Sequence, residues 1–251
     1  MDYIIFNKFE DIEFKNLKIG VPKEYEPGKI FSELRYFDSK DKGKKNIYLQ
    51  SSELVIGNLQ WGPEDEEGRV AVAYLDLYSL NNSKPKSQTN EFKNFLNGLD
   101  LYLCRKIWET RRHWKLEEKT PSLKIEKGYI PTLGLSPLGG ISRNCLRFEL
   151  GLKSYGKNNH YLETDIYDQE NDELPLSLLK SEYRSRALIS IKGILKEGNY
   201  YSLVLGLKQL KVKVPENVFE SCQLSDSEDS EPVSDIWDIY QNEIVEDLEE
   251  H

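Results

Sequence analysis

The sequence contains few of the residues that build metal centres, disulfide frameworks or membrane spans. Its 251 residues include three cysteines and three histidines. Cys104, Cys145 and Cys222 form no Cys-x-x-Cys pair and are odd in number, so we expect reduced thiols and neither disulfides nor a zinc site. No segment reaches the ~18 uninterrupted apolar residues that a membrane-spanning helix needs, so no membrane association is expected.

The amino terminus lacks the marks of secretion. Residues 1–8 show no basic start followed by an apolar core. No signal peptide is therefore predicted, and we expect the protein to remain inside a cell.

Signatures of catalysis are scarce. His113, His160 and His251 lie in unrelated contexts, and neither a phosphate-binding glycine loop nor a Gly-x-Ser-x-Gly turn occurs. We therefore expect a protein that is not an enzyme and uses no cofactor or metal. The alternative is a magnesium-dependent nuclease, whose carboxylates would be Glu149, Glu163, Asp165 and Asp168, with Lys153 nearby.

Negative charge is concentrated at the carboxyl end. Residues 221–251 contain eleven acids and no Lys or Arg, so this segment carries a charge of −11. The net charge of the whole chain is −9, which leaves residues 1–220 at +2. This division predicts a folded domain over 1–220 and a disordered acidic interaction tail over 221–251. Spacings of three and four in the tail predict one apolar helix side for partner binding, formed by Trp237, Tyr240, Ile244 and Leu248.

Short alternating segments predict a mainly β body. The expected strands are 46–54, 70–78, 146–153, 160–167, 185–195 and 200–214. The last two are predicted to form a hairpin around Gly198 and Asn199. Alternation gives this hairpin an apolar face, with Ala187, Ile189, Ile191, Leu195, Leu210 and Val212, and a cationic face, with Arg184, Arg186, Ser190, Lys192, Lys211 and Lys213.

One segment has helical spacing instead. It runs from Asn90, as the N-cap, to about Lys115, and its apolar side carries Phe92, Leu96, Leu99, Leu103 and Ile107. The opposite side is basic and carries Arg105, Trp108, Arg112 and Lys115. This pattern predicts either an ordinary solvated helix face or a surface that contacts phosphates.

Aromatic residues lie next to basic ones at several places in the body. Proteins that hold single-stranded nucleic acid combine cationic grooves with rings on which bases stack. The candidate DNA-binding residues are Lys44, Lys45, Tyr48, Arg105, Trp108, Arg111, Arg112, Lys192, Lys211 and Lys213.

The order and spacing of these segments resemble the single-stranded DNA-binding proteins of the nucleocytoplasmic large DNA viruses. Those proteins are relatives of phage proteins that join an OB-fold core to an acidic carboxyl tail. The resemblance covers about residues 30–214 and is carried by 46–51, 92–108, 161–168, 187–193 and 205–212. The chain differs in having Ser52 where relatives carry proline, and Ile194, Leu195 and Leu205 where they tend to carry aromatic residues.

The resemblance implies an OB-like Greek-key barrel with one inserted basic helix. It implies non-catalytic, sequence-tolerant binding of single-stranded DNA in viral replication, repair or recombination. The tail would compete with DNA and dock replication proteins. The resemblance leaves the oligomeric state undecided, with a homodimer as one option. The expected location is the viral factory in the host cytoplasm, the nucleus or the virion. The alternative is a protein-interaction or virion structural module without direct nucleic-acid binding.

Overall fold

The computed structural model describes residues 2–38, 43–65, 68–77, 87–135, 143–150, 152–154, 160–162, 164–175 and 178–215. The chain divides after Val214, and the fold described below is that of the first unit, Met1–Val214. The predicted boundary between residues 220 and 221 lies outside the described residues. None of the described helices combines the length and apolar character that crossing a bilayer requires.

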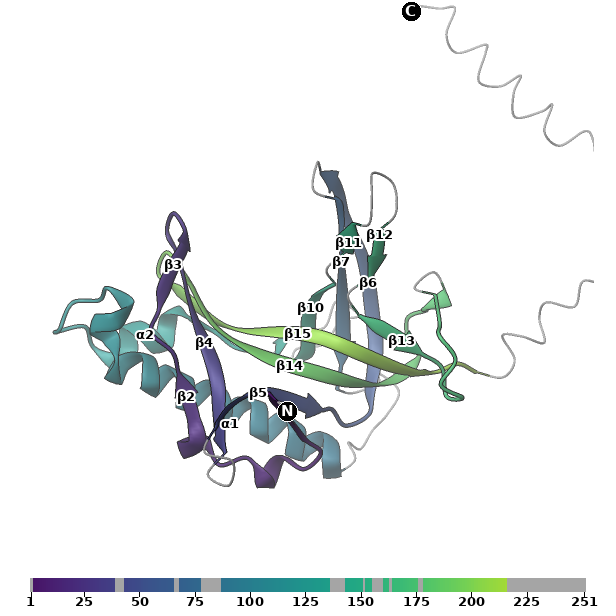
Figure 1. Cartoon of the computed structure of the whole chain (residues 1–251), viewed down its shortest axis with the longest axis horizontal. Coiled ribbons are helices and arrows are strands. Elements are labelled where there is room, and N and C mark those ends of the chain that lie inside the picture. Colours follow the sequence, from purple (N-terminus) through teal and green to yellow (C-terminus); the bar gives the residue numbers. More distant parts are fainter. Residues whose placement is uncertain are drawn as a thin grey trace, which may run out of the picture. The chain divides into compact units, whose positions relative to one another are not determined.

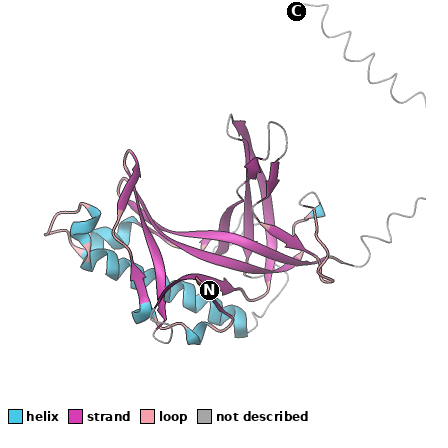
Figure 2. Ribbon diagram, viewed as in Figure 1, coloured by secondary structure: helices cyan, strands magenta, loops and turns pink. Residues whose placement is uncertain are grey.

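The first unit is mainly β, as predicted, and contains a large mixed sheet (Figures 1 and 2). The strands are β1 (Tyr3–Phe6), β2 (Leu17–Ile19), β3 (Lys23–Glu26), β4 (Lys29–Asp38), β5 (Gly43–Gln50), β6 (Leu54–Asp65), β7 (Gly68–Asp76), β8 (Tyr129–Ile130), β9 (Gly134–Leu135), β10 (Arg143–Leu150), β11 (Leu152–Ser154), β12 (His160–Leu162), β13 (Asp165–Tyr167), β14 (Arg184–Glu197) and β15 (Tyr200–Lys213). The helices are α1 (Ser87–Glu109) and α2 (Ser122–Gly128), with short 3-10 turns η1 (Phe9–Asp11), η2 (Phe14–Asn16) and η3 (Arg111–Trp114).

The β14–β15 hairpin runs across the first unit (Figure 1). Its turn contains Gly198 at φ +57°, a left-handed conformation that glycine adopts without the penalty of a Cβ. The register shifts twice along the hairpin, once after Leu188 and once between Ile191 and Gly193. Such bulges bend and twist a strand pair, which allows one long hairpin to serve different neighbours along its length.

The outer edge of β14 changes partner from one end to the other. Its start pairs with β6, its middle with β5 and its end with β4. Because β4 and β5 also pair with each other, the three strands form a closed circuit of hydrogen-bonded neighbours, and the sheet curls at this point. At the crossing, a Cβ on Gly193 would lie 2.2 Å from the Ser32 carbonyl oxygen, so only glycine fits.

The remaining strands extend this arrangement on both sides. β6, β7, β10 and β9 continue the sheet as antiparallel neighbours. β1 lies parallel to β5, while β8 and β13 lie parallel to β15. The predicted strand 46–54 is wrong in extent, because β5 ends at Gln50 and β6 begins at Leu54. Likewise, the predicted strand 160–167 is divided between β12 and β13.

Burial confirms the two predicted faces over most of the hairpin. Ile189 and Val212 are buried, whereas Arg186 and Lys211 are exposed. Two assignments are wrong. Ser190 shares the face of Arg186 but is buried rather than exposed, and the bond from its hydroxyl to the Gly206 carbonyl, at 3.1 Å, satisfies it inside the fold. Beyond the bulge at Lys192 the alternation reverses, so Ile194 is fully buried while Leu195 is half-buried.

Helix α1 lies below β4, β5 and β14 in Figure 1. All five residues of its predicted apolar side are buried. The helix begins at Ser87, so Asn90 lies inside its first turn and is not the N-cap. It ends at Glu109 rather than near Lys115, because Thr110 leaves helical geometry, with φ −105° and ψ 21°, and the chain then turns into η3. The second helix, α2, corrects the expectation of one helix.

Candidate nucleic-acid interface

A groove of about 830 Å³ follows the exposed side chains at the start of β14 and the end of β15. We call it the hairpin groove. Its described lining residues include four cations and one carboxylate: Arg184, Arg186, Lys211, Lys213 and Glu53. The hairpin groove is therefore strongly positive, although the body as a whole is nearly neutral.

The strand register forces these cations together. Arg184 lies directly opposite Lys213, and Arg186 lies directly opposite Lys211. Like charges that face each other across an antiparallel pair destabilise the sheet. The two pairs are two residues apart, which places them ~7 Å apart along the strands. A bound polyanion would relieve this repulsion.

Two of the four cations have partners in the fold. Arg184 forms an ion pair with Glu53 at 3.3 Å, and the Lys211 ammonium donates to the Asn171 side-chain oxygen at 2.6 Å. Within the described part of the chain, the side chains of Arg186 and Lys213 form no hydrogen bond or ion pair. Their charges are therefore available to a ligand.

One tyrosine ring borders the cations, and a second lies farther along the same face, outside the groove lining. Tyr167 of β13 is in register beside Lys211, and both line the groove. On the other side of the hairpin, Tyr48 of β5 is in register with Ser190 of β14 and packs edge-on against Tyr3, with ring centres 5.6 Å apart. Side chains in register share a face of the sheet, so Tyr48 lies on the same face as Arg186.

The remaining predicted strand cations lie elsewhere. Lys192 is exposed at the second bulge of β14 and does not line the hairpin groove. Lys44 and Lys45 lie at the start of β5, where Lys44 lines a hollow of about 460 Å³ together with Lys18 and Arg35. The structure therefore brings Lys211 and Lys213 together, but not with Lys44, Lys45 or Lys192.

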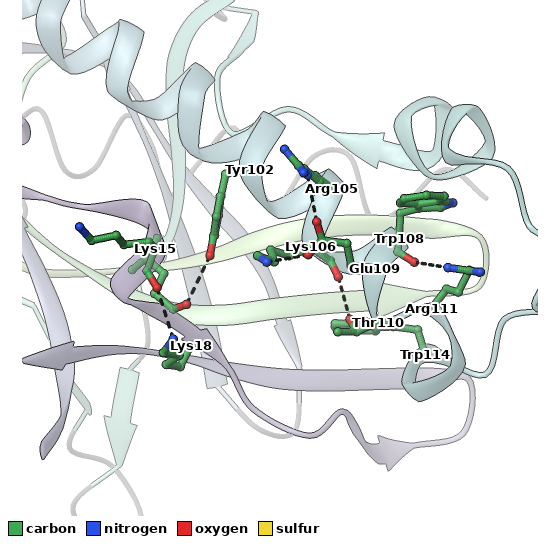
Figure 3. A network of polar contacts seen from close by, with 11 residues as sticks. Lys15, Lys18, Tyr102, Arg105, Lys106, Trp108, Glu109, Thr110, Arg111 and Trp114 are labelled. Atoms are coloured by element: carbon green, nitrogen blue, oxygen red, sulfur yellow. Dashed lines mark hydrogen bonds and ion pairs between the residues drawn. The ribbon is translucent and has the colours of Figure 1, made fainter. Parts of the chain in front are cut away.

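Arg105 lies in a second basic groove, beside α1 and β2, of about 410 Å³ (Figure 3). We call it the helix groove. Each of its cations has a local partner. Arg105 and Lys106 both pair with Glu109, at 2.9 and 2.6 Å, and the Lys106 hydrogen bond lowers the pKa of that carboxyl. Of the other two basic residues, Lys15 forms an ion pair with Glu13, and the Lys18 ammonium donates to the Lys15 carbonyl.

Trp108, Arg111 and Arg112 hold the end of α1 to the segment that follows it. The Trp108 ring nitrogen donates to the Thr120 carbonyl at 3.2 Å, and Arg111 lies over the Trp108 ring at 5.2 Å. Arg111 also donates to the Trp108 and Glu118 carbonyls, while Arg112 pairs with the Glu118 carboxylate. Figure 3 shows Arg111 reaching back to Trp108. These three residues line neither groove.

The carboxylates considered for a nuclease are not assembled as far as the structure describes them. Asp168 accepts the backbone amides of Glu170 and Asp172, at 2.8 and 2.9 Å, and so closes a local turn. Asp165 is exposed on β13. The side chains of Glu149, Lys153 and Glu163 lie outside the described part. Among the described residues, no cluster of His, Cys, Asp and Glu suits a metal ion.

The two described cysteines are buried and unpaired with each other. Burial raises the pKa of both Cys104 and Cys145 to about 12, so neither supplies a thiolate near neutral pH. Cys222 and the predicted partner-binding residues Trp237, Tyr240, Ile244 and Leu248 lie outside the described residues.

Sequence reasoning placed Arg184 and Arg186 on the cationic strand face but did not select them as binding residues. Tyr167 and Glu53 were missed because they meet the hairpin only through the sheet topology. These residues of the hairpin groove can therefore be identified only once the strand pairing is known. Comparison of the sequence with protein-family models and with curated proteins finds no match.

Proposed function

We propose that the first unit binds single-stranded nucleic acid, with the phosphates of the strand along the hairpin groove. The observation that carries this proposal is the pair of opposed cation pairs, Arg184 with Lys213 and Arg186 with Lys211. Such an arrangement costs stability in the unbound protein, and phosphates supply the missing counter-charge.

The small net charge of the body and its partly exposed rings favour a single strand over a duplex. Duplex binders usually show a strong basic excess, whereas residues 1–220 carry only +2. Tyr167 beside Lys211 is half-buried, and so is Tyr48 farther along the same face of the sheet, so each presents part of its ring. Of the two rings only Tyr167 lines the hairpin groove, and a ring in this position can stack on a base that is free of a duplex. The resemblance described above adds DNA as the nucleic acid and viral replication, repair or recombination as the setting.

We also propose that the sheet of the first unit forms an OB-like barrel. The circuit of pairings among β4, β5 and β14 supports a sheet that closes on itself, as an OB-like barrel requires. An experimental structure with the strand order of an open, uncurled sheet would contradict it.

Fluorescence anisotropy with labelled oligo-dT and a matched duplex, over a range of salt concentrations, tests the function. We expect tighter binding of the single strand and a salt slope of about −0.7 per phosphate neutralised. The double variant Arg186→Gln/Lys213→Gln should weaken binding and make the slope shallower. The matched control, Lys15→Gln/Arg105→Gln, removes the same charge from the helix groove and should bind as the wild type does.

Three results would overturn the proposal. The first is the absence of single-strand binding at low salt. The second is duplex binding of equal strength, and the third is an equal loss of affinity in the control variant, which would show that net charge alone matters.

The second candidate function is a protein-interaction module, and it depends on a different surface. Ile130 of β8 and Tyr200 of β15 are large apolar side chains with more than half of their surface exposed. The parallel register of β8 and β15 places them on the same face. If the first unit fails to bind nucleic acid, this patch is the surface to examine for a protein partner.

A further inference from the structure

A second hollow, of about 730 Å³, adjoins the hairpin groove. The two share Asn7, Gln50 and Arg186 as lining residues, so they form a continuous depression. The other walls come from the segment of η1 and η2 and from one side of α1 between Gln88 and Gly98. We call this hollow the amide pocket, because four amide side chains line it: Asn7, Gln50, Gln88 and Asn94.

The amide side chains are available for hydrogen bonding. Within the described part of the chain, none of the four forms a hydrogen bond with another residue. Each offers both donors and an acceptor. The ionisable lining residues balance, since Lys8 and Arg186 are matched by Glu10 and Glu91. The pocket therefore suits an uncharged ligand with a polar edge, in contrast to the hairpin groove.

Phenylalanine rings form the apolar wall of the pocket. Phe9 and Phe14 are half-buried, so part of each ring is available to a ligand. Phe9 is held in place by stacking on Phe92 and Phe95, with ring centres 4.8 and 5.4 Å apart. A ring surface next to free amides matches a flat molecule that is apolar on its faces and polar at its edge.

The fold fixes the junction between the pocket and the groove. After β5 the chain turns at Ser51, whose hydroxyl accepts the Ala187 amide at 2.8 Å and donates to the Ser52 carbonyl at 2.7 Å. The Ser51 amide in turn donates to the Ala187 carbonyl at 2.9 Å. These bonds tie Gln50, at the end of β5, to the part of β14 that carries Arg186.

We propose that the amide pocket holds one base of the bound strand, turned out of the stack. The base would lie against Phe9 and Phe14, with its edge read by the amides, while Arg186 contacts the adjoining phosphate. The volume lies within the ~300–1,000 Å³ of small-molecule sites. Proteins read single strands in this way, through splayed bases stacked on rings and bonded at their edges. This inference depends on the proposed function and adds a base preference at one position.

The test compares the affinities of oligo-dT, oligo-dA and oligo-dC for wild type and for the variant Asn7→Ala/Gln50→Ala/Asn94→Ala. All three substituted side chains are exposed, so the fold should persist. The wild type should prefer one oligomer, and in the variant the affinities should converge to within roughly twofold. Its salt slope should stay unchanged. The control is Asn97→Ala, which removes an exposed amide of α1 that does not line the pocket.

A second variant and a modified oligomer check the ring contact. Phe9→Leu keeps an apolar side chain but removes the stacking surface, and affinity for the preferred oligomer should fall ~5- to 150-fold. A single abasic position scanned along that oligomer should weaken wild-type binding most at one place.

The binding results distinguish a failure of the amide-pocket proposal from a failure of the hairpin-groove proposal. Equal wild-type affinity for all three oligomers, or discrimination retained by the triple variant, would overturn the pocket while the hairpin groove stands. A wild type that binds no single strand would overturn both. Uniform weakening of the triple variant, with its preference intact, would also contradict the pocket, because its amides would then not read the base.

Discussion

Arg186 and Lys211 lie directly opposite each other on β14 and β15, with Tyr167 of β13 in register beside Lys211. A second cation pair, Arg184 and Lys213, lies two residues away on the same face. Neighbouring strands thus carry like charges where opposite charges would stabilise the sheet. This repulsion costs stability in the unbound protein, and under the proposed function the phosphates of the bound strand would relieve it.

This arrangement predicts opposite effects on stability and binding. Arg186→Gln and Lys213→Gln should each raise the free energy of unfolding at low salt by ~0.2–1 kcal/mol, because each removes one repulsive pair. Urea denaturation measures the change, and the gain should shrink as salt screens the charges. The control is Lys23→Gln on β3, where the residue opposite is Phe31 rather than a cation. Lower stability of both groove variants would contradict the repulsion argument.

Asp100 gives a prediction for the core. The Tyr129 hydroxyl donates to its carboxylate at 3.0 Å, and the Thr132 amide and hydroxyl donate at 2.8 and 2.5 Å. Asp100→Ala removes the acceptor of these buried donors and should destabilise the fold by ~1–3 kcal/mol or more. Tyr129→Phe loses one hydrogen bond and should cost ~1 kcal/mol. Thermal or urea unfolding checks both, and an equal cost would argue against the shared carboxylate.

The same carboxylate predicts a pH dependence. Burial raises the pKa of Asp100 above its usual value, and the hydrogen bonds of Thr132 and Tyr129 only partly oppose this effect. The folded state therefore holds the proton more tightly than the unfolded state. The contribution of Asp100 to stability is full at pH values below its unfolded pKa of ~3.9, and falls as pH rises through the raised folded pKa. Compared with wild type, Asp100→Asn should lose this dependence in unfolding measured across that window.

Gly193 gives a test of the strand crossing. An added Cβ would lie 2.2 Å from the Ser32 carbonyl oxygen and 2.6 Å from the Phe31 ring, so β14 and β4 would have to move apart. Gly193→Ala should destabilise the first unit by ~1–3 kcal/mol. Gly28→Ala is a contrasting variant, because its cost comes from a φ of +78° with open space around it. A neutral Gly193→Ala would mean that the strands do not pair as closely as described.

Local patterns predicted the hairpin and the apolar side of α1, because both depend on regular alternation or helical spacing. β4 was missed although it alternates. One of its inward positions is Ser32, whose hydroxyl donates to the Gly20 carbonyl at 2.7 Å, so burial there does not require an apolar residue. The bulge at Lys192 defeated the alternation rule for a different reason, since a single extra residue reverses which side chains point inward.

The candidate site was only half predictable. Alternation placed the cations of the hairpin groove on one face of two adjacent strands, but the register that sets Arg184 against Lys213 and Arg186 against Lys211 comes from the structure. The amide pocket combines Asn7, Gln50, Asn94 and Arg186, which are far apart in the sequence. Isolated amides carry no local signal, and their meeting depends on the pairing of β5 with β14 and on the position of α1.

The last prediction concerns the acidic tail and follows from charge. Residues 221–251 carry −11, whereas the hairpin groove presents four cations against one carboxylate. If the acids compete with DNA for these cations, removal of 221–251 should tighten single-strand binding severalfold at low salt, and the gain should shrink at high salt as screening weakens the competition. A full-length variant with its eleven acids changed to amides keeps the length of the tail and should bind like the truncated chain. Equal affinity of full-length and truncated protein at low salt, measured by anisotropy, would exclude competition. The tail would then act only in partner docking, which Trp237→Ala is expected to weaken.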